Sequence, residues 1–197
     1  MNGRTHEMAA AASAVAIMHG SDSRSLVVGT MVALMAGTLP DIDLVDNRKG
    51  KGLKMVMEVI KQAIIPIGMA VYYGSDVYQI ALWIGLCVFL VLQPHRGFSH
   101  SIWCMGIMCG AFVWLTDEAY MDWFLIGYIS HLLLDILNTK DVAILFPKGL
   151  CLKAVKAGGL ADDLIGTLAA GIFAIIILFR FADMDLVNRV VMALNGG

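Results

Sequence analysis

Charged side chains are scarce in this sequence. Only 15% of the 197 residues are Asp, Glu, Lys or Arg, whereas 59% are apolar. Soluble globular domains carry about 25% charged residues. A water-soluble fold of this length could not bury so much apolar surface, so lipid must cover part of it. The length suits one compact bundle, and we expect a single membrane-embedded domain over residues 1–197.

Two further absences exclude classes of function. The four cysteines include no CxxC pair, so the sequence predicts neither a zinc knuckle nor a thioredoxin-like redox site. We interpret these cysteines as small apolar residues within helices. No basic stripe with interleaved aromatic residues occurs, and we therefore expect no nucleic-acid partner.

The chain does contain a series of apolar runs separated by short polar breaks. This pattern predicts an all-α, multi-pass transmembrane bundle of six or seven helices. The predicted helices span residues 8–18, 26–39, 55–73, 77–92, 101–115, 121–138 and 163–181. The first is the weakest candidate to cross a bilayer, which takes about 20 residues. Residues 182–197 are a candidate amphipathic surface helix.

Small residues recur at four-residue spacing in two of these helices. Gly29, Ala33 and Gly37 form one row, and Gly106 with Gly110 forms another. Such rows allow helices to approach closely in lipid. We interpret both rows as packing signals.

Positive charge is distributed unequally between the two ends of the predicted helices. Only Arg24, Arg180 and Arg189 fall on one side of the path. The other eleven Lys and Arg residues fall on the opposite side: Arg4, Arg48, Lys49, Lys51, Lys54, Lys61, Arg96, Lys140, Lys148, Lys153 and Lys156. By the positive-inside rule that side is cytoplasmic, which predicts seven segments with the N-terminus inside.

His131 and Asp135 are the most informative polar pair. Their spacing of four puts both side chains on one helix face, among leucines. An ionisable pair in such a run is costly in lipid and should face the protein interior. A hydrogen bond that pins two helices would explain the pair, but imidazole and carboxylate are also ordinary zinc ligands.

Asp41 and Asp43 follow the predicted end of the second helix. Pro40 disfavours helix at Leu39, so the helix should end about there. In an extended stretch a spacing of two points both carboxylates the same way. A solvated turn is one explanation. Two carboxylates so close would otherwise repel unless a cation lay between them, and a metal is the simplest cation.

His95 and His100 lie in the polar link between the fourth and fifth predicted helices. Their spacing of five does not suit one face of a straight helix, but a loop followed by a helix start at Ser99, with Ser99 as N-cap, would aim both inward. Arg96 suits the binding of a phosphate or carboxylate. An interfacial loop whose arginine meets lipid headgroups is the alternative.

His6, Asp162 and Asp163 complete the set of polar residues at this face. His6 is less specific by itself, and His19 falls at the opposite face, where we interpret it as structural. Asp162 and Asp163 also favour a helix N-terminus electrostatically. Together, four histidines and four or five aspartates at one face exceed what packing needs.

The motifs occur in a specific order along the chain. The order is His6, LPDID at residues 39–43, HRGFSHS at 95–101, GYISHLLLDILN at 127–138 and ILFPK at 144–148. This order resembles the YdjM-like family, described as LexA-regulated, inner-membrane, metal-dependent hydrolases of bacteria and phages. The resemblance runs from about residue 6 to residue 165. Its motif positions fall on His6, Asp41, Asp43, His95, His100, His131 and Asp135. Members usually open the last helix with Glu, where this chain has Asp162.

We therefore expect a metal-dependent hydrolase whose site lies at the cytoplasmic face of the inner membrane. The expected metal ligands are His6, Asp41, Asp43, His95, His131 and Asp135. His100 is an expected ligand or general acid, and Arg96 an anion clamp; both are the expected catalytic residues. Ser99, Asn138 and Asp162 are candidate accessory residues.

Zinc is the expected metal, with manganese or iron as alternatives. So many ligands suit a two-metal site. A phosphoester or a lipid-linked small molecule is the expected substrate, and membrane lipid the expected partner.

Two other classes of function remain open from the sequence. A transporter or proton-coupled channel also places His and Asp in the membrane, but distributed through its depth. A non-catalytic metal-binding protein that assembles membrane partners would use the same residues without turnover.

Overall fold

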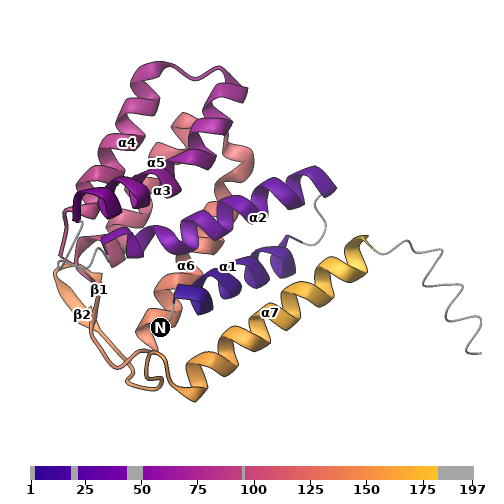
Figure 1. Cartoon of the computed structure of the whole chain (residues 1–197), viewed down its shortest axis with the longest axis vertical. Helices are drawn as coiled ribbons and strands as arrows, with labels where there is room; N and C mark the ends of the chain where they lie inside the picture. Colours follow the sequence, from indigo (N-terminus) through magenta and orange to yellow (C-terminus); the bar gives the residue numbers. More distant parts are fainter. Residues whose placement is uncertain (1–2, 19–21, 44–50, 95, 182–197) are drawn as a thin grey trace, which may run out of the picture.

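The computed structural model describes residues 3–18, 22–43, 51–94 and 96–181 (Figure 1). Its α-helices are α1 (Gly3–Ile17), α2 (Ser23–Thr38), α3 (Lys51–Tyr73), α4 (Val77–Val91), α5 (Ile102–Leu115), α6 (Met121–Ile136) and α7 (Leu160–Phe181). These helices confirm the all-α bundle and match the seven predicted runs. The candidate tail helix at 182–197 lies outside the described residues.

Three short 3-10 segments and one hairpin complete the described chain. The 3-10 segments are η1 (Leu39–Asp43), η2 (Phe98–His100) and η3 (Glu118–Tyr120). The antiparallel hairpin consists of β1 (Val142–Leu145) and β2 (Lys148–Leu150), and it was not predicted. Its strands are too short for a clear alternation of apolar and polar residues to stand out in the sequence.

Three of the described helical segments are long and apolar enough to cross a membrane. They are Ser23–Asp43, Gly52–Tyr73 and Leu160–Arg180, and α4 and α5 are shorter apolar helices. Large apolar side chains are exposed on these segments, Val71 and Leu178 among them. This outward-facing apolar surface is what a lipid environment stabilises.

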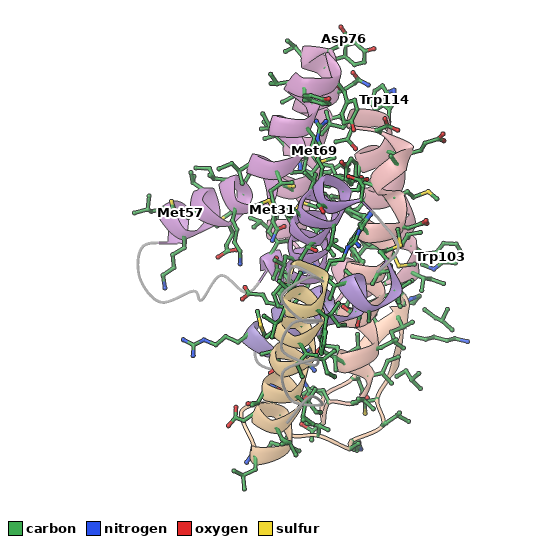
Figure 2. The ribbon with its side chains drawn as sticks, turned by 90° about the vertical axis from the view of Figure 1, so that its right-hand side faces the viewer. Met31, Met57, Met69, Asp76, Trp103 and Trp114 are labelled. Atoms are coloured by element: carbon green, nitrogen blue, oxygen red, sulfur yellow. The ribbon has the colours of Figure 1, made fainter. Side chains whose placement is uncertain are left out.

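Helix α3 changes direction along its length. Figure 2 shows its first half, with Met57, projecting sideways from the body, and its second half, with Met69, running toward Asp76. Pro66 lies inside this helix. A proline removes one backbone hydrogen bond and crowds the preceding turn, which is the usual cause of such a bend.

Helices α2 and α6 touch through their backbones. A Cβ added to Gly127 would lie 2.2 Å from Ala33 O, and one added to Gly29 would lie 2.2 Å from the Trp123 ring. A Cβ on Gly37 would lie 2.6 Å from Ala10 Cβ of α1. The row of small residues on α2 is therefore a close-packing surface, as expected.

The second predicted row behaves differently. A Cβ added to Gly106 or Gly110 would meet no described atom within 4 Å. The interpretation of these two glycines as a helix-packing row is wrong for the described part of the chain, because α5 turns that face away from its neighbours.

The link after α2 also differs from expectation. The α-helix ends at Thr38, next to Leu39, as Pro40 predicts. The following residues form the 3-10 turn η1 and not an extended strand. A 3-10 helix has three residues per turn, so Asp41 and Asp43 point in different directions and not the same way.

Several segments that are distant in the sequence meet at one end of the molecule. Figure 1 shows α1, α2 and α7 side by side, with the starts of α1 and α7 at the same end as the finish of α2. η1 packs against η2 at this end. The chain that follows the hairpin is hydrogen-bonded to the end of α6, for example from Leu152 N to Ile136 O (2.7 Å).

Candidate metal centre

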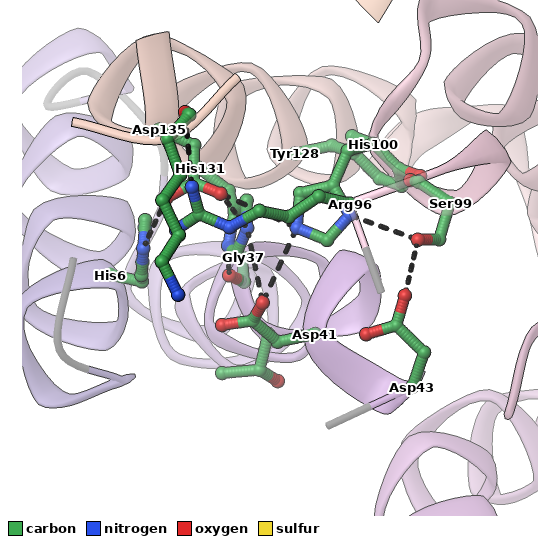
Figure 3. A network of polar contacts seen from close by, with 12 residues as sticks. His6, Gly37, Asp41, Asp43, Arg96, Ser99, His100, Tyr128, His131 and Asp135 are labelled. Carbon is green, nitrogen blue, oxygen red and sulfur yellow. Dashed lines mark hydrogen bonds and ion pairs between the residues drawn. The ribbon is translucent and has the colours of Figure 1, made fainter. Parts of the chain in front are cut away.

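Three histidines and two aspartates converge at this end of the bundle. They come from α1 (His6), η1 (Asp41), η2 (His100) and α6 (His131 and Asp135), as Figure 3 shows. Four of these side chains are buried, and Asp41 is half-buried. Segments more than a hundred residues apart along the chain thus share one polar pocket.

Two carboxylates face two imidazoles at the centre of this cluster. His100 Nε2 lies 3.3 Å from Asp41 Oδ1 and 3.4 Å from Asp135 Oδ2. His131 Nε2 lies 3.8 Å from each of the same two oxygens. Ligands about 2.0–2.1 Å from a tetrahedral zinc ion are roughly 3.3–3.4 Å from one another. The four N–O separations are therefore close to those between ligands of one ion, and His100, His131 and Asp135 form one group that could hold a metal ion.

The contact of His131 with α2 shows which of its two ring nitrogens carries a hydrogen. His131 Nδ1 lies 2.7 Å from Gly37 O. A carbonyl oxygen only accepts, so Nδ1 carries the hydrogen and donates it. The lone pair of the neutral ring is then on Nε2, which is buried and has no hydrogen-bond partner among the described residues. Metal-ligating histidines are commonly held in this way.

His100 is oriented by a hydroxyl group. Ser99 Oγ donates to Asp43 Oδ2 (2.8 Å) and lies 2.9 Å from His100 Nδ1 (Figure 3). The single hydroxyl hydrogen goes to the carboxylate, which only accepts, so His100 Nδ1 must donate to the Ser99 oxygen. This chain of contacts turns Nε2 of His100 toward Asp41 and Asp135.

The resulting charge distribution fits a cation. The buried lone pair of His131 faces the carboxylates of Asp41 and Asp135. Such an arrangement is repulsive unless a positive ion lies among the donors. With neutral imidazoles the five side chains carry a charge of −2, which one divalent ion would neutralise. The donor set and the orphaned His131 Nε2 therefore fit a metal ion.

His6 extends the cluster beyond these four residues. Its Nε2 lies 3.3 Å from Asp135 Oδ1, and its ring stacks on His131 with centroids 3.9 Å apart. Asp135 therefore presents Oδ2 to His100 and His131, and Oδ1 to His6. His6, Asp41 and His131 form a second group of donors that overlaps the first.

Arg96 reaches the cluster from the link before α5. Its Nη2 lies 3.8 Å from Asp135 Oδ1, and its Nη1 donates to Lys140 O (3.1 Å). Its carbonyl accepts from Ala143 N of β1 (3.3 Å), so the hairpin holds this link in place. Arg96 has a φ of 63°, a conformation that non-glycine residues rarely adopt.

The remaining expected site residues lie outside these donor groups. Asp43 is one hydrogen bond removed from the cluster, through Ser99. Asn138 Oδ1 accepts from Thr139 N (2.7 Å). Asp162 Oδ2 accepts from Gly158 N (2.8 Å) at the start of α7. The predicted ligand His95 lies outside the described residues, as does His19.

Ser99 was expected to cap the helix after it, and the structure corrects this. Ser101 is the N-cap of α5, and its hydroxyl accepts from Cys104 N (3.1 Å). Ser99 cannot do the same because its hydroxyl lies between Asp43 and His100.

The chain matches one known protein family. The family model described as YdjM inner membrane protein matches residues 1–192. The chain belongs to this family. No curated protein and no solved structure matches the chain. Membership and the long apolar helices together establish a membrane location and confirm the family resemblance read from the motifs.

A small cavity leads to the donors of this family member. It has a volume of about 160 Å³ and lies between α1, the end of α2 and α3, with His6 and Asp41 in its wall. Glu7, Glu58 and Lys61 also line it, so carboxylates outnumber ammonium groups and the cavity favours cations. The sequence patterns did not single out these three residues, because only the packing of α3 against α1 brings them to the site.

Proposed function

We propose that the protein is a multi-pass inner-membrane hydrolase that depends on a divalent metal bound by the His–Asp cluster. One observation carries this proposal. His100 Nε2 and His131 Nε2 each lie 3.3–3.8 Å from Asp41 Oδ1 and from Asp135 Oδ2, in two overlapping groups of side chains that could hold a metal ion. A hydrogen-bond network alone does not explain the buried Nε2 of His131, which has no hydrogen-bond partner among the described residues.

Zinc is the metal we propose, because imidazole nitrogen and carboxylate oxygen are both among its usual ligands. Manganese or iron would accept the same donors. His6 and the second oxygen of Asp135 provide donors toward a second ion. A bound divalent ion would supply a hydroxide nucleophile near neutral pH, by lowering the pKa of its water.

The side chains around the donors have separate tasks in this proposal. His100 acts as a ligand, since its Nε2 faces both carboxylates, and not as a free general acid. Ser99 and Asp43 hold His100 in the ligating tautomer. Arg96 is anchored at the rim by Lys140 O and holds an anionic substrate group with its remaining donors. A phosphoester, free or lipid-linked, is the substrate class that this arrangement favours.

The distribution of buried charge favours a site over a transport path. In the described part of the chain the buried histidines and aspartates are His6, Asp43, His100, His131, Asp135 and Asp162. All belong to the cluster, to Asp43 one hydrogen bond away from it, or to the start of α7. A proton or ion path would need such residues at successive depths of the membrane.

The positive-inside rule assigns the cluster to the cytoplasmic face. Arg96, Lys140 and Lys148 lie in the links beside the cluster, whereas Arg24 and Arg180 lie at the opposite ends of α2 and α7. Cytoplasmic loops carry the excess of Lys and Arg in membrane proteins.

Metal analysis of the purified protein tests this proposal. We expect at least one divalent ion per chain after purification without chelator, and its loss in Asp135→Asn and His131→Ala. Asp122→Asn is the matched control, because Asp122 is an exposed carboxylate at the other end of the same helix. A native chain that neither retains nor takes up a divalent ion would contradict the proposal.

Turnover separates an enzyme from a metal-binding assembly protein. The metal-loaded protein in detergent is offered bis(p-nitrophenyl) phosphate, p-nitrophenyl phosphate and phosphatidic acid, with Asp135→Asn as the inactive control. Hydrolysis of any of these by the native chain alone supports the hydrolase. Stable metal binding with no hydrolysis of the three would indicate a non-catalytic role.

A further inference from the structure

A groove runs along the seam between α1 and α6. It has a volume of about 340 Å³ and is separate from the polar cavity beside Lys61. Ala9, Ser13 and Ile17 line it from α1, and Ile126, Ile129 and Leu133 are among the residues that line it from α6.

The lining of this groove is apolar and faces outward. Ile17 is 62% exposed, Leu133 57% and Ile129 40%. Its two polar residues are serines, and the Ser130 hydroxyl donates to Gly127 O within its own helix (2.8 Å). A groove of this kind in a membrane protein is filled by hydrocarbon, because water gains no hydrogen bonds there.

The groove continues the seam that carries the metal donors. His6 lies about one turn before Ala9 on α1, His131 lies between the groove residues Ser130 and Leu133 of α6, and Asp135 follows Leu134. The rings of His6 and His131 stack on each other, so the two helices are in contact next to the groove. A molecule in the groove would therefore point one end at the cluster.

The length of the groove matches one lipid leaflet. From Ala9 to Ile17 the helix rises about 12 Å. The hydrocarbon of one leaflet is about 15 Å deep, half of a ~30 Å core. Helix α1 runs beside α2 and α7, which are both long enough to cross a membrane (Figure 1). A chain in the groove would extend toward the bilayer centre while its head stays at the depth of the cluster.

We propose that this groove binds an acyl chain of the substrate, and that the substrate is a membrane phospholipid and not a water-soluble phosphoester. This proposal rests on the proposed function, since it places the lipid headgroup at the metal centre. Arg96 lies 3.8 Å from Asp135 and supplies positive charge for the headgroup phosphate.

A second apolar groove does not fit this role. It lies between α2 and α3, has a volume of about 300 Å³ and is lined by Arg24 and Tyr72. Arg24 is at the start of α2, whereas Asp41 follows its end, so this groove opens far from the cluster.

Photo-cross-linking tests the proposal directly. The native protein is reconstituted with a phosphatidylglycerol that carries a diazirine in its acyl chain, and the labelled peptides are mapped by mass spectrometry. We expect labelling concentrated in residues 9–17 and 126–134. Ser13→Phe, which fills the groove, should reduce this labelling at least several-fold.

Ile107→Phe is the matched control, because Ile107 is 51% exposed on α5, away from the groove. It should leave the labelling pattern unchanged. Labelling spread evenly over all lipid-facing helices in the native protein would overturn the proposal, whether or not Ser13→Phe folds.

Metal content measured on the same samples keeps the two proposals distinguishable. Bound metal without groove labelling would contradict the acyl-chain site and leave a hydrolase of soluble substrates. Absence of bound metal would contradict the hydrolase, whatever the labelling pattern.

Discussion

A hydroxyl group decides which nitrogen of His100 faces the carboxylates. Ser99 donates to Asp43 and accepts from His100 Nδ1, so His100 Nε2 is directed at Asp41 and Asp135. Without the hydroxyl, the imidazole loses the acceptor that holds its tautomer and ring orientation. Partners of this kind typically contribute 10- to 100-fold to metal affinity.

From this contact between Ser99 and His100 we expect Ser99→Ala to weaken divalent-metal binding by about 10- to 100-fold. Ser99→Thr, which restores a hydroxyl, should recover most of the loss. Competition with a fluorescent chelator measures the affinity. The control is Ser101→Ala, which removes the cap of α5 and should cost about 1 kcal/mol of stability without changing metal affinity. Equal effects of the two alanine variants on affinity would contradict the role of Ser99.

Among the elements, the contact between α2 and α6 positions the site. Gly127 lies against the Ala33 backbone, and one turn further along each helix His131 donates to Gly37 O. The backbone contact and the orientation of the histidine are therefore coupled. A side chain at Gly127 would have to displace backbone atoms, which cannot move as freely as the end of a side chain.

For this contact we expect Gly127→Ala to destabilise the protein by about 1–3 kcal/mol through overpacking. It should also lower metal affinity, because α6 must move away from Gly37. Gly110→Ala is the control, since its Cβ meets no described atom, and it should be neutral or stabilise α5 by up to about 1 kcal/mol. Thermal unfolding in detergent, followed with and without added zinc, measures both effects. A Gly127→Ala variant as stable as Gly110→Ala would show that the helices are not in backbone contact.

Over the whole molecule, ionisable and apolar residues are separated. The buried histidines and aspartates gather at one end, and exposed apolar side chains cover α3, α5 and α7. This separation leaves a polar pocket whose His and Asp side chains could hold a metal ion, beside helices whose apolar faces suit lipid. By the positive-inside rule, the asymmetry in Lys and Arg supports the proposed cytoplasmic side for this pocket.

For the orientation we expect Lys140→Cys to be protected from a membrane-impermeant maleimide in intact spheroplasts and labelled after permeabilisation. Glu118→Cys, at the other end of α6, should be labelled without permeabilisation. Lys140 and Glu118 are both exposed, so a difference in labelling between the two cysteine variants does not come from a difference in burial. Cys151 is replaced by Ser in both variants, because it is the most exposed native cysteine of the described residues. The reverse pattern would place the metal centre on the outer side of the inner membrane.

Local sequence patterns predicted the seven helices and the end of the bundle at which the polar residues gather. Long apolar runs and Pro40 act locally, so residue order alone predicts where helices begin and end. The spacing of His131 and Asp135 likewise placed both on one face before any packing was known. These features depend on neighbours a few residues away.

Which side chains share the donor cluster depends on how the helices pack, and the sequence did not predict it. Asp43 was expected as a ligand and lies behind Ser99, while His100 faces both carboxylates. Asp43 lies outside the donor cluster because the 3-10 turn η1 points Asp41 and Asp43 in different directions. The hairpin behind Arg96 and the cavity beside α3 were also not predictable. Their residues come from segments that meet only when helices pack, and helix packing depends on contacts between distant parts of the chain.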